Sequence, residues 1–137
     1  MSKQSIYLSK HLQTEYSVVY KELCKVLDES GVNPSLLPYS NDIWARDFMP
    51  VHVGGGQYLG YIYKPDYLFD KVRMRKYITE QKMATRDLPI NYITQLDIVL
   101  DGGNFVFCDD KMIMTDKIFS ENPNIKQSTL INTLENA

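Results

Sequence analysis

Within the first forty residues, the spacing of apolar side chains changes from that of a strand to that of a helix and back to that of a strand. This order restricts the folds that the chain can adopt. Residues 5–9 alternate apolar and polar side chains, which predicts a short strand. Residues 12–29 repeat apolar side chains three or four positions apart, as on one helix face, and Gly31 follows as a stop signal. Residues 35–39 predict a second strand, which is parallel to the first if the helix is a crossover.

A glycine-linked hairpin follows. Residues 50–53 and 57–63 predict two strands, and Gly54, Gly55 and Gly56 stand between them. Glycine supplies the positive φ that a tight hairpin needs, so we expect these strands to pair antiparallel. A charged stretch at 71–83 predicts a surface helix or an irregular excursion.

The second half predicts more strands and a final helix. The three expected strands span 97–100, 104–108 and 111–115, with turns at Gly102–Gly103 and Asp109–Asp110. Ser128 is placed to cap a helix that runs to Asn136. Together these segments predict an α/β (α+β) fold with mixed sheets, in a single domain over residues 1–137.

Composition excludes several classes of protein. Hydrophobic residues make up 44% of the 137, enough for a core. The formal charge is −2 with both signs interspersed, so no positive field for nucleic acid is expected. The chain has no signal-like start and no long apolar run. We therefore expect a cytoplasmic protein with no nucleic-acid or membrane partner, unless an export signal has been removed.

The two cysteines predict no metal site. Cys24 and Cys108 each lie in an apolar-periodic stretch, and the chain has no CxxC motif or Cys/His cluster. This usage favours two buried free thiols, with a disulfide as the open alternative.

Two segments concentrate polar residues at the ends of expected strands, where binding groups collect in α/β folds. They are NDIWARDFMP at 41–50 and LDGGNF at 100–105. Asp, Gly and Asn also favour ordinary turns, so a purely structural role is the alternative for both. In the first segment, Trp44 lies among Asp42, Arg46 and Asp47. A flat apolar wall beside carboxylates suits a cation that has an aliphatic stem.

These two segments resemble those of a known enzyme family. NDIWARDFMPV is similar to the [N/S]D-x-W-x-RD-x-G-P segment of agmatine deiminases and bacterial peptidylarginine deiminases, and LDGGNF is similar to the [E/D]GGN segment that follows it. The resemblance extends over most of residues 5–137. It implies the guanidine-modifying (pentein) superfamily, whose fold is an α/β propeller of ββαβ modules, and it places this chain in the N-terminal part of that domain.

The resemblance also implies a reaction. These enzymes hydrolyse a guanidinium carbon–nitrogen bond to a ureido product and ammonia, without metal or organic cofactor. A Cys thiolate attacks the guanidinium carbon, a His serves as general acid and base, and acids hold the cation. The implied small-molecule substrate carries a guanidinium group, as agmatine or an arginine side chain does, with a mild preference for agmatine and thus putrescine biosynthesis.

Site residues follow from matching the motifs position by position. Asp47 matches the carboxylate that grips the guanidinium, Trp44 the wall beside the aliphatic stem, and Asp101 the acid that orients the catalytic His. Gly102, Gly103 and Asn104 match the backbone turn at the site. Asn41, Asp42 and Arg46 match supporting positions, and we expect Asp42 and Arg46 to contribute to substrate binding. Arg46 either pairs with an acid to hold the loop or forms a surface ion pair.

The sequence departs from the family pattern at two points. Met49 stands where the family usually has Gly before Pro50. More importantly, the family's His and Cys lie beyond the DGGN segment. Here His11 and His52 precede Asp101, and neither Cys24 nor Cys108 matches the nucleophile. We therefore expect a deiminase-like N-terminal portion that is inactive alone.

Two other functions remain open. A non-catalytic module with the same cation pocket would bind arginine-like groups, and a structural module would cover its bare face with another copy. Because an open propeller segment leaves sheet edges and apolar surface exposed, we expect a homo-oligomer.

Overall fold

The computed structural model describes residues 5–90, 93–108 and 111–137. In chain order the elements are β1 (Tyr7–Ser9), α1 (Lys10–Glu15), α2 (Ser17–Glu29), β2 (Ser35–Leu37), α3 (Ala45–Phe48), β3 (Val51–Gly54), β4 (Gln57–Ile62), α4 (Asp66–Phe69), η1 (Val72–Tyr77), α5 (Gln81–Thr85), β5 (Ile93–Val99), η2 (Gly102–Asn104), β6 (Phe105–Cys108), β7 (Lys111–Met114), α6 (Lys117–Glu121) and α7 (Gln127–Glu135). They form a mixed α/β structure with three small sheets in the described residues.

The first sheet confirms the predicted crossover. β1 and β2 pair in parallel, with Tyr7 opposite Ser35, and α1 and α2 connect them. The single helix expected over 12–29 is instead two helices that meet at Tyr16, whose ψ of 47° is not helical. Gly31, at a φ of +72°, ends α2 as predicted. A left-handed residue just after a helix satisfies its last carbonyl groups.

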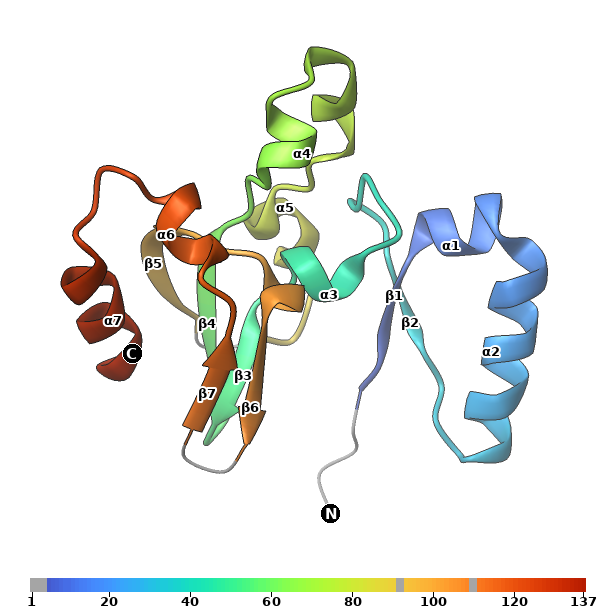
Figure 1. The fold of residues 1–137 in the computed structure, drawn as a ribbon. Coiled ribbons are helices and arrows are strands. Elements are labelled where there is room, and N and C mark those ends of the chain that lie inside the picture. Colours follow the sequence, from blue (N-terminus) through green and yellow to red (C-terminus); the bar gives the residue numbers. More distant parts are fainter. Residues whose placement is uncertain (1–4, 91–92, 109–110) are drawn as a thin grey trace.

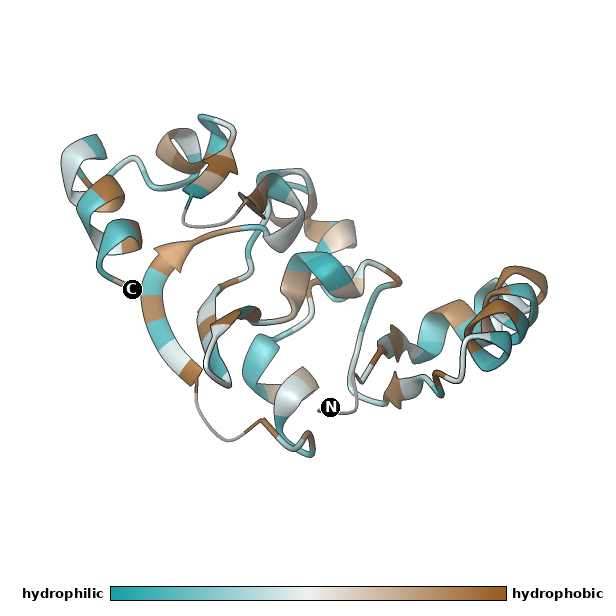
Figure 2. Cartoon of the chain, turned by 90° about the horizontal axis from the view of Figure 1, so that it is seen from below, coloured by the Kyte–Doolittle hydropathy of each residue, from teal (hydrophilic) through white to brown (hydrophobic). Residues whose placement is uncertain are grey.

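The apolar face of α2 is largely exposed. No residue of α1 or α2 is buried, and Val18, Val19 and Val26 are 73%, 56% and 58% exposed. Figure 1 shows α2 beside the β1–β2 pair at one end of the molecule, and Figure 2 shows apolar positions along these helices. Two strands of three residues each are too short to cover a thirteen-residue helix. The amphipathic pattern predicted the helix correctly without identifying what covers it.

The central sheet has the order β3–β4–β5. β3 and β4 form the predicted antiparallel hairpin, and Gly54, Gly55 and Gly56 all have positive φ. β5 pairs in parallel with β4, with Tyr58 opposite Ile93. The connection between them contains α4, η1 and α5, which fall in and around the stretch expected to be a helix or an excursion. β5 begins at Ile93, four residues before the predicted strand, because its exposed Thr94 and Gln95 obscured the apolar pattern.

The third sheet is the antiparallel pair β6–β7, with Phe105 opposite Met114. The predicted turn at Asp109–Asp110 lies outside the described residues. The last helix, α7, was expected to be capped by Ser128, but its N-cap is Lys126 and Ser128 lies inside the helix. The short helices α3, α4 and α6 were not predicted, since four or five residues do not establish a helical period.

The core lies between the central sheet, the β6–β7 pair and the helices α3, α6 and α7. Its buried apolar side chains are Leu37, Phe48, Val51, Leu59, Tyr61, Tyr63, Ala84, Leu96, Ile98, Leu100, Phe105, Ile118 and Leu130. Both cysteines are free, as favoured, but Cys24 is half-buried and Cys108 exposed, so the expectation of burial is wrong. No helix of the described residues is long and apolar enough to cross a membrane.

Candidate functional site

The two polar segments identified in the sequence lie directly against each other. The first contains α3, and the second contains η2. A Cβ added at Gly102 would overlap the backbone oxygen of Arg46 and the hydroxyl of Tyr61, and one added at Gly103 would overlap the carboxylate of Asp47. Neither glycine is among the positive-φ residues, so both are required by close packing rather than by backbone conformation. This contact brings Asp47 and Asp101 together.

Asp101 follows β5 and caps the turn that it begins. Its Oδ1 accepts a hydrogen bond of 3.0 Å from the Gly103 N–H, and its carbonyl accepts one of 2.9 Å from the Asn104 N–H. The residue is only 9% exposed. The turn predicted at Gly102, Gly103 and Asn104 is therefore one turn of 3₁₀-helix that fixes a mostly buried carboxylate.

Asp47 forms an acid pair with Asp101. Burial raises the pKa of Asp47 to about 6, with further contributions from the Asp101 charge, a hydrogen bond between the two carboxyl groups and the Asp42 charge. The N–H of Gly103 acts in the opposite direction. Two neighbouring carboxylates repel each other when both are ionised, so one of them retains a proton up to higher pH. Near pH 6 and below, Asp47 therefore gains charge readily when a cation is bound beside it.

Tyr61, which sequence reasoning missed, fixes the backbone that carries Asp47. Its hydroxyl lies 2.8 Å from the carbonyl oxygens of both Asp47 and Met49, and its ring is buried. Met49 has an extended backbone at φ −77° and ψ 147°, which accommodates a side chain at the position where the deiminase motif in the sequence analysis has glycine. Burial, followed by the Asp101 charge, raises the pKa of Tyr61, which keeps its hydroxyl neutral.

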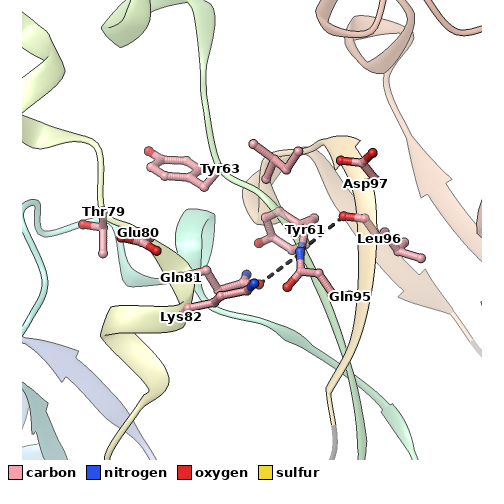
Figure 3. A pocket seen from close by; sticks show the side chains of 10 residues that line it. Tyr61, Tyr63, Thr79, Glu80, Gln81, Lys82, Gln95, Leu96 and Asp97 are labelled. Carbon is pink, nitrogen blue, oxygen red and sulfur yellow. Dashed lines mark hydrogen bonds between the residues drawn. The ribbon is translucent and has the colours of Figure 1, made fainter.

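Gln81 anchors the same segment from the other side. Its Oε1 accepts a 3.0 Å hydrogen bond from the Tyr61 N–H, and its Nε2 donates one of 2.9 Å to the Phe48 carbonyl. Gln81 also lines a cavity of about 390 Å³ beside β4 and β5, where it faces Gln95 (Figure 3). Asp47 and Asp101 do not line this cavity. The cavity therefore lies beside Tyr61 and Gln81, which support the site, and not at the acid pair itself.

Asn41 and Asp42 fix the backbone where the first segment begins. The Asn41 N–H donates to Thr79 Oγ1 and its Nδ2 donates to the Ile78 carbonyl, both at 2.9 Å. Asp42 Oδ1 accepts a 2.6 Å hydrogen bond from the Ile43 N–H. Both residues therefore shape this loop, and Asp42 in addition acts on Asp47 through its charge.

Arg46 has a different partner from either one predicted. Its Nη2 donates a 3.1 Å hydrogen bond to the Phe105 carbonyl, and its guanidinium lies 5.4 Å from the centre of the Phe105 ring. Within the part of the chain that the structure describes, Arg46 has no salt bridge. It joins α3 to the start of β6, and so it reinforces the contact between the two segments.

Trp44 is the N-cap of α3 and is 59% exposed. An exposed indole at the N-cap of the helix that carries Asp47 is available to contact a ligand. Its role as an apolar wall of the site stays a prediction.

A cluster of charged residues extends the site beyond the two segments. Lys117 Nζ lies 3.1 Å from Glu121 Oε1, 3.7 Å from Asp66 Oδ1 and 3.9 Å from Asp101 Oδ2. The Glu121 side chain is 3% exposed, and burial raises the pKa of its carboxyl group. Burial opposes the charge of Lys117, but its acidic neighbours outweigh this effect and raise its pKa. No sequence motif pointed to this cluster, because its members are far apart in the chain.

The two histidines are engaged away from the acid pair. His11 bonds to Glu15 and to the Ser40 carbonyl, and His52 packs against Tyr58 at 5.1 Å between ring centres. No group of three or more His, Cys, Asp or Glu side chains in the described residues is arranged to hold a metal ion. What the site offers is a pair of carboxyl groups, which suits an organic cation with several N–H donors.

Comparison with known proteins supports the fold alone. No protein-family model matches the sequence, and no curated protein matches it by sequence. The structure is similar to that of C. jejuni agmatine deiminase, with a TM-score of 0.64 and 15% identity. It is also similar to a cysteine-to-serine variant of C. jejuni agmatine deiminase with substrate bound, with a TM-score of 0.70 and 18% identity. Each match covers 98% of this chain and 50% of the other, so this chain spans about half the length of those proteins.

Proposed function

We propose that this chain is the N-terminal portion of a deiminase-type hydrolase and holds the guanidinium group of its substrate. The observation that carries this proposal is the Asp47–Asp101 acid pair, which is assembled by direct contact between two segments that resemble deiminase motifs. The similarity to agmatine deiminase structures supports the same fold. In this proposal the described sheets are part of a propeller of ββαβ modules, and residues 1–137 are one part of a single domain.

Asp47 grips the cation in this proposal. Guanidinium is planar and permanently charged, and its N–H groups pair with carboxylate oxygens. A bound cation favours the ionised form of Asp47, so that any proton remaining on this carboxyl group is released on binding. Each charge-assisted hydrogen bond contributes about 1.5–3 kcal/mol. Two such bonds give a dissociation constant on the order of 1 mM for a site with only one wall.

Asp101 serves a different purpose. It is fixed by the Gly103 N–H and faces Lys117, which leaves it less free to meet the substrate. We assign it the orientation of a histidine that another part of the enzyme supplies. Trp44 lies along the aliphatic stem of the substrate, whether agmatine or an arginine side chain. No cofactor is needed, because the attack by a cysteine thiolate and the proton transfers by a histidine complete the reaction.

The chain alone should not turn over substrate, because His11 and His52 are engaged elsewhere and Cys108 lies exposed on β6. An ammonia-release assay with agmatine and with arginine peptides checks this expectation. Turnover that disappears in Cys108→Ala would contradict it and identify a nucleophile within this chain.

Binding is tested by an NMR titration of the backbone amides of Gly102 and Gly103. Agmatine should shift both signals in the wild type and much less in Asp47→Asn. Putrescine, which lacks the guanidinium group, is the matched ligand control and should shift them less. Equal shifts with agmatine in the wild type and in Asp47→Asn would overturn the proposed site.

A structural oligomer is the second candidate, supported by the exposed apolar residues on α2 and on the β6–β7 pair. Val18 on α2 is 73% exposed, and Val106 and Ile113 on the hairpin are 62% and 66% exposed. Apolar surface of this kind favours self-association. Light scattering at micromolar concentration should show a dimer or larger assembly. A monodisperse monomer would count against this candidate.

A further inference from the structure

The two acids of the site have different partners. Asp47 and Asp101 each have a carboxylate oxygen within 3.4 Å of the point where a Cβ on Gly103 would lie, so the two carboxyl groups are neighbours. Asp101 Oδ1 accepts a 3.0 Å hydrogen bond from the Gly103 N–H, and its Oδ2 lies 3.9 Å from Lys117 Nζ. Both oxygens of Asp101 therefore face a positive partner. Within the described residues, no ion pair reaches Asp47.

A second cation lies close to the acids but is directed elsewhere. Arg46 is on the same helix as Asp47, and its guanidinium donates to the Phe105 carbonyl at 3.1 Å and lies 5.4 Å from the centre of that ring. The other nearby charge is Asp42, which raises the pKa of Asp47. Among the residues that the structure describes, Lys117 is therefore the one Lys or Arg that forms an ion pair with either acid.

Two further carboxyl groups hold Lys117 beside Asp101. Its Nζ lies 3.1 Å from Glu121 Oε1, one turn later on α6, and 3.7 Å from Asp66 Oδ1 on α4. Figure 1 shows α6 below α4, near the upper end of β4. The Glu121 side chain is 3% exposed, and a carboxylate removed from water in this way needs a cation close by. Two helices that are distant in the sequence thus fix one ammonium group next to Asp101.

The neighbouring tyrosines do not add charge to this cluster. The Tyr61 hydroxyl lies 2.8 Å from the Asp47 carbonyl oxygen, and Lys117 lies 5.4 Å from the centre of the Tyr67 ring. Burial raises the pKa of both tyrosines, so both are neutral over the range in which carboxyl groups titrate. The charge of the acid pair is therefore set by carboxyl groups and by Lys117.

A cation beside one of two neighbouring carboxyl groups decides where a proton of the pair resides. The two carboxylates repel each other, so the pair keeps one proton up to higher pH. A positive charge near one group favours its ionised form, and the proton then resides mostly on the other group. The pKa of Asp47 agrees with this, since burial and then the Asp101 charge raise it to about 6.

We propose that Lys117 is a positioning residue of the acid pair: it compensates the charge of Asp101, which leaves Asp47 as the carboxyl group that takes up a proton or a cation. A guanidinium group at Asp101 would meet the ammonium group of Lys117, so the bound cation is directed to Asp47. This directing role rests on the proposed function, because it assumes that the pair binds a guanidinium cation. The division of charge concerns the free protein.

A pH titration of the ¹³Cγ signals of both acids, without ligand, tests the division of charge. In the wild type, the step near pH 6 should appear mainly in the Asp47 signal. The variant Lys117→Met/Glu121→Gln removes the cation together with the buried carboxylate that needs it, so no unpaired buried charge is left. In this variant a large part of the step should move to the Asp101 signal. Lys117→Arg and Glu121→Gln each keep a cation and should leave the step at Asp47.

Two results would overturn the division of charge. If the step stays at Asp47 in Lys117→Met/Glu121→Gln, then Lys117 does not decide where the proton resides. If the wild type already shows the step in the Asp101 signal, the proposal fails without any variant. A merely structural role of Lys117 would lower the stability of the variant without moving the step from one signal to the other.

Agmatine titrations by NMR test the directing role. In the wild type, Asp47→Asn should weaken agmatine binding about tenfold or more, as expected for lost hydrogen bonds between charged groups. In the Lys117→Met/Glu121→Gln background it should weaken binding less than about threefold, because Asp101 is then free to meet the cation. Equal losses in both backgrounds would overturn the directing role. If the wild type does not bind agmatine, the proposed function and the directing role fail together, and the ligand-free titration still decides the division of charge.

Discussion

Replacing Gly102 by Ala should separate the two segments that form the acid pair. An added Cβ would overlap the backbone oxygen of Arg46 and the hydroxyl of Tyr61. The backbone oxygen cannot rotate away as the end of a side chain can, so α3 and η2 must move apart. Gly102 has no positive φ, so none of the expected cost comes from backbone strain.

The magnitude follows from three contributions. Overpacking against a fixed neighbour costs about 1–3 kcal/mol, and here the upper half of that range applies. Displacing the Tyr61 hydroxyl from its two carbonyl partners costs about 1 kcal/mol more. Alanine loses less backbone entropy on folding than glycine, which returns about 0.4–1 kcal/mol. The variant should therefore lose about 2–3.5 kcal/mol of the free energy of unfolding.

Urea unfolding followed by circular dichroism measures this loss, with Gly55→Ala as the matched control. Gly55 has a φ of +57° and open space around it, so its substitution should cost only about 1 kcal/mol of backbone strain. In Gly102→Ala, the pKa of Asp47 should also fall toward its ordinary value, because the Asp101 carboxylate moves away. If Gly102→Ala costs no more than Gly55→Ala and leaves the pKa of Asp47 near 6, the described contact is incorrect.

Three further predictions concern the same site. Because the pKa of Asp47 is raised to about 6 in the folded protein, the wild type should lose stability as pH rises from about 4 to 6, by about 1–2 kcal/mol after allowance for solvent screening. Urea unfolding across this pH range should show a flatter profile for Asp47→Asn, and identical profiles would refute the shift. Lys117→Met should cost about 2 kcal/mol, because it leaves the buried Glu121 carboxylate without its cation. Adding Glu121→Gln to that variant should restore most of the loss, and no recovery would argue against the ion pair. Arg46→Lys should cost about 1 kcal/mol in thermal unfolding through the lost hydrogen bond to Phe105, and an unchanged melting temperature would contradict that role.

The sequence predicted the elements of this fold better than the contacts between them. Period and glycine placement predicted the parallel β1–β2 crossover and the β3–β4 hairpin, since both follow from local backbone preferences. The same kind of pattern predicted a helix at α2, but the apolar face of that helix is exposed. The spacing of apolar residues shows which face of a helix is apolar. It does not show whether the rest of the fold has enough surface to cover that face.

The candidate site could also be predicted only in part from the sequence. Asp47 and Asp101 could be singled out from the sequence because each lies in a short segment with an unusual set of residues, and the structure brings these two segments together. The supporting contacts could not be identified in the same way. Arg46 donates to a backbone carbonyl, and any residue could provide that acceptor. Tyr61 and Lys117 come from an ordinary strand and an ordinary helix, and only the folded arrangement brings them to the acid pair.

The central claim is that the Asp47–Asp101 pair binds a guanidinium cation. The most direct test is the pKa of Asp47, followed by its ¹³Cγ signal in the full chain with and without agmatine. A bound cation favours the ionised carboxylate, so the pKa of Asp47 should fall from about 6 toward the ordinary range as agmatine is added. A pKa that stays near 6 at the highest agmatine concentration would contradict the claim.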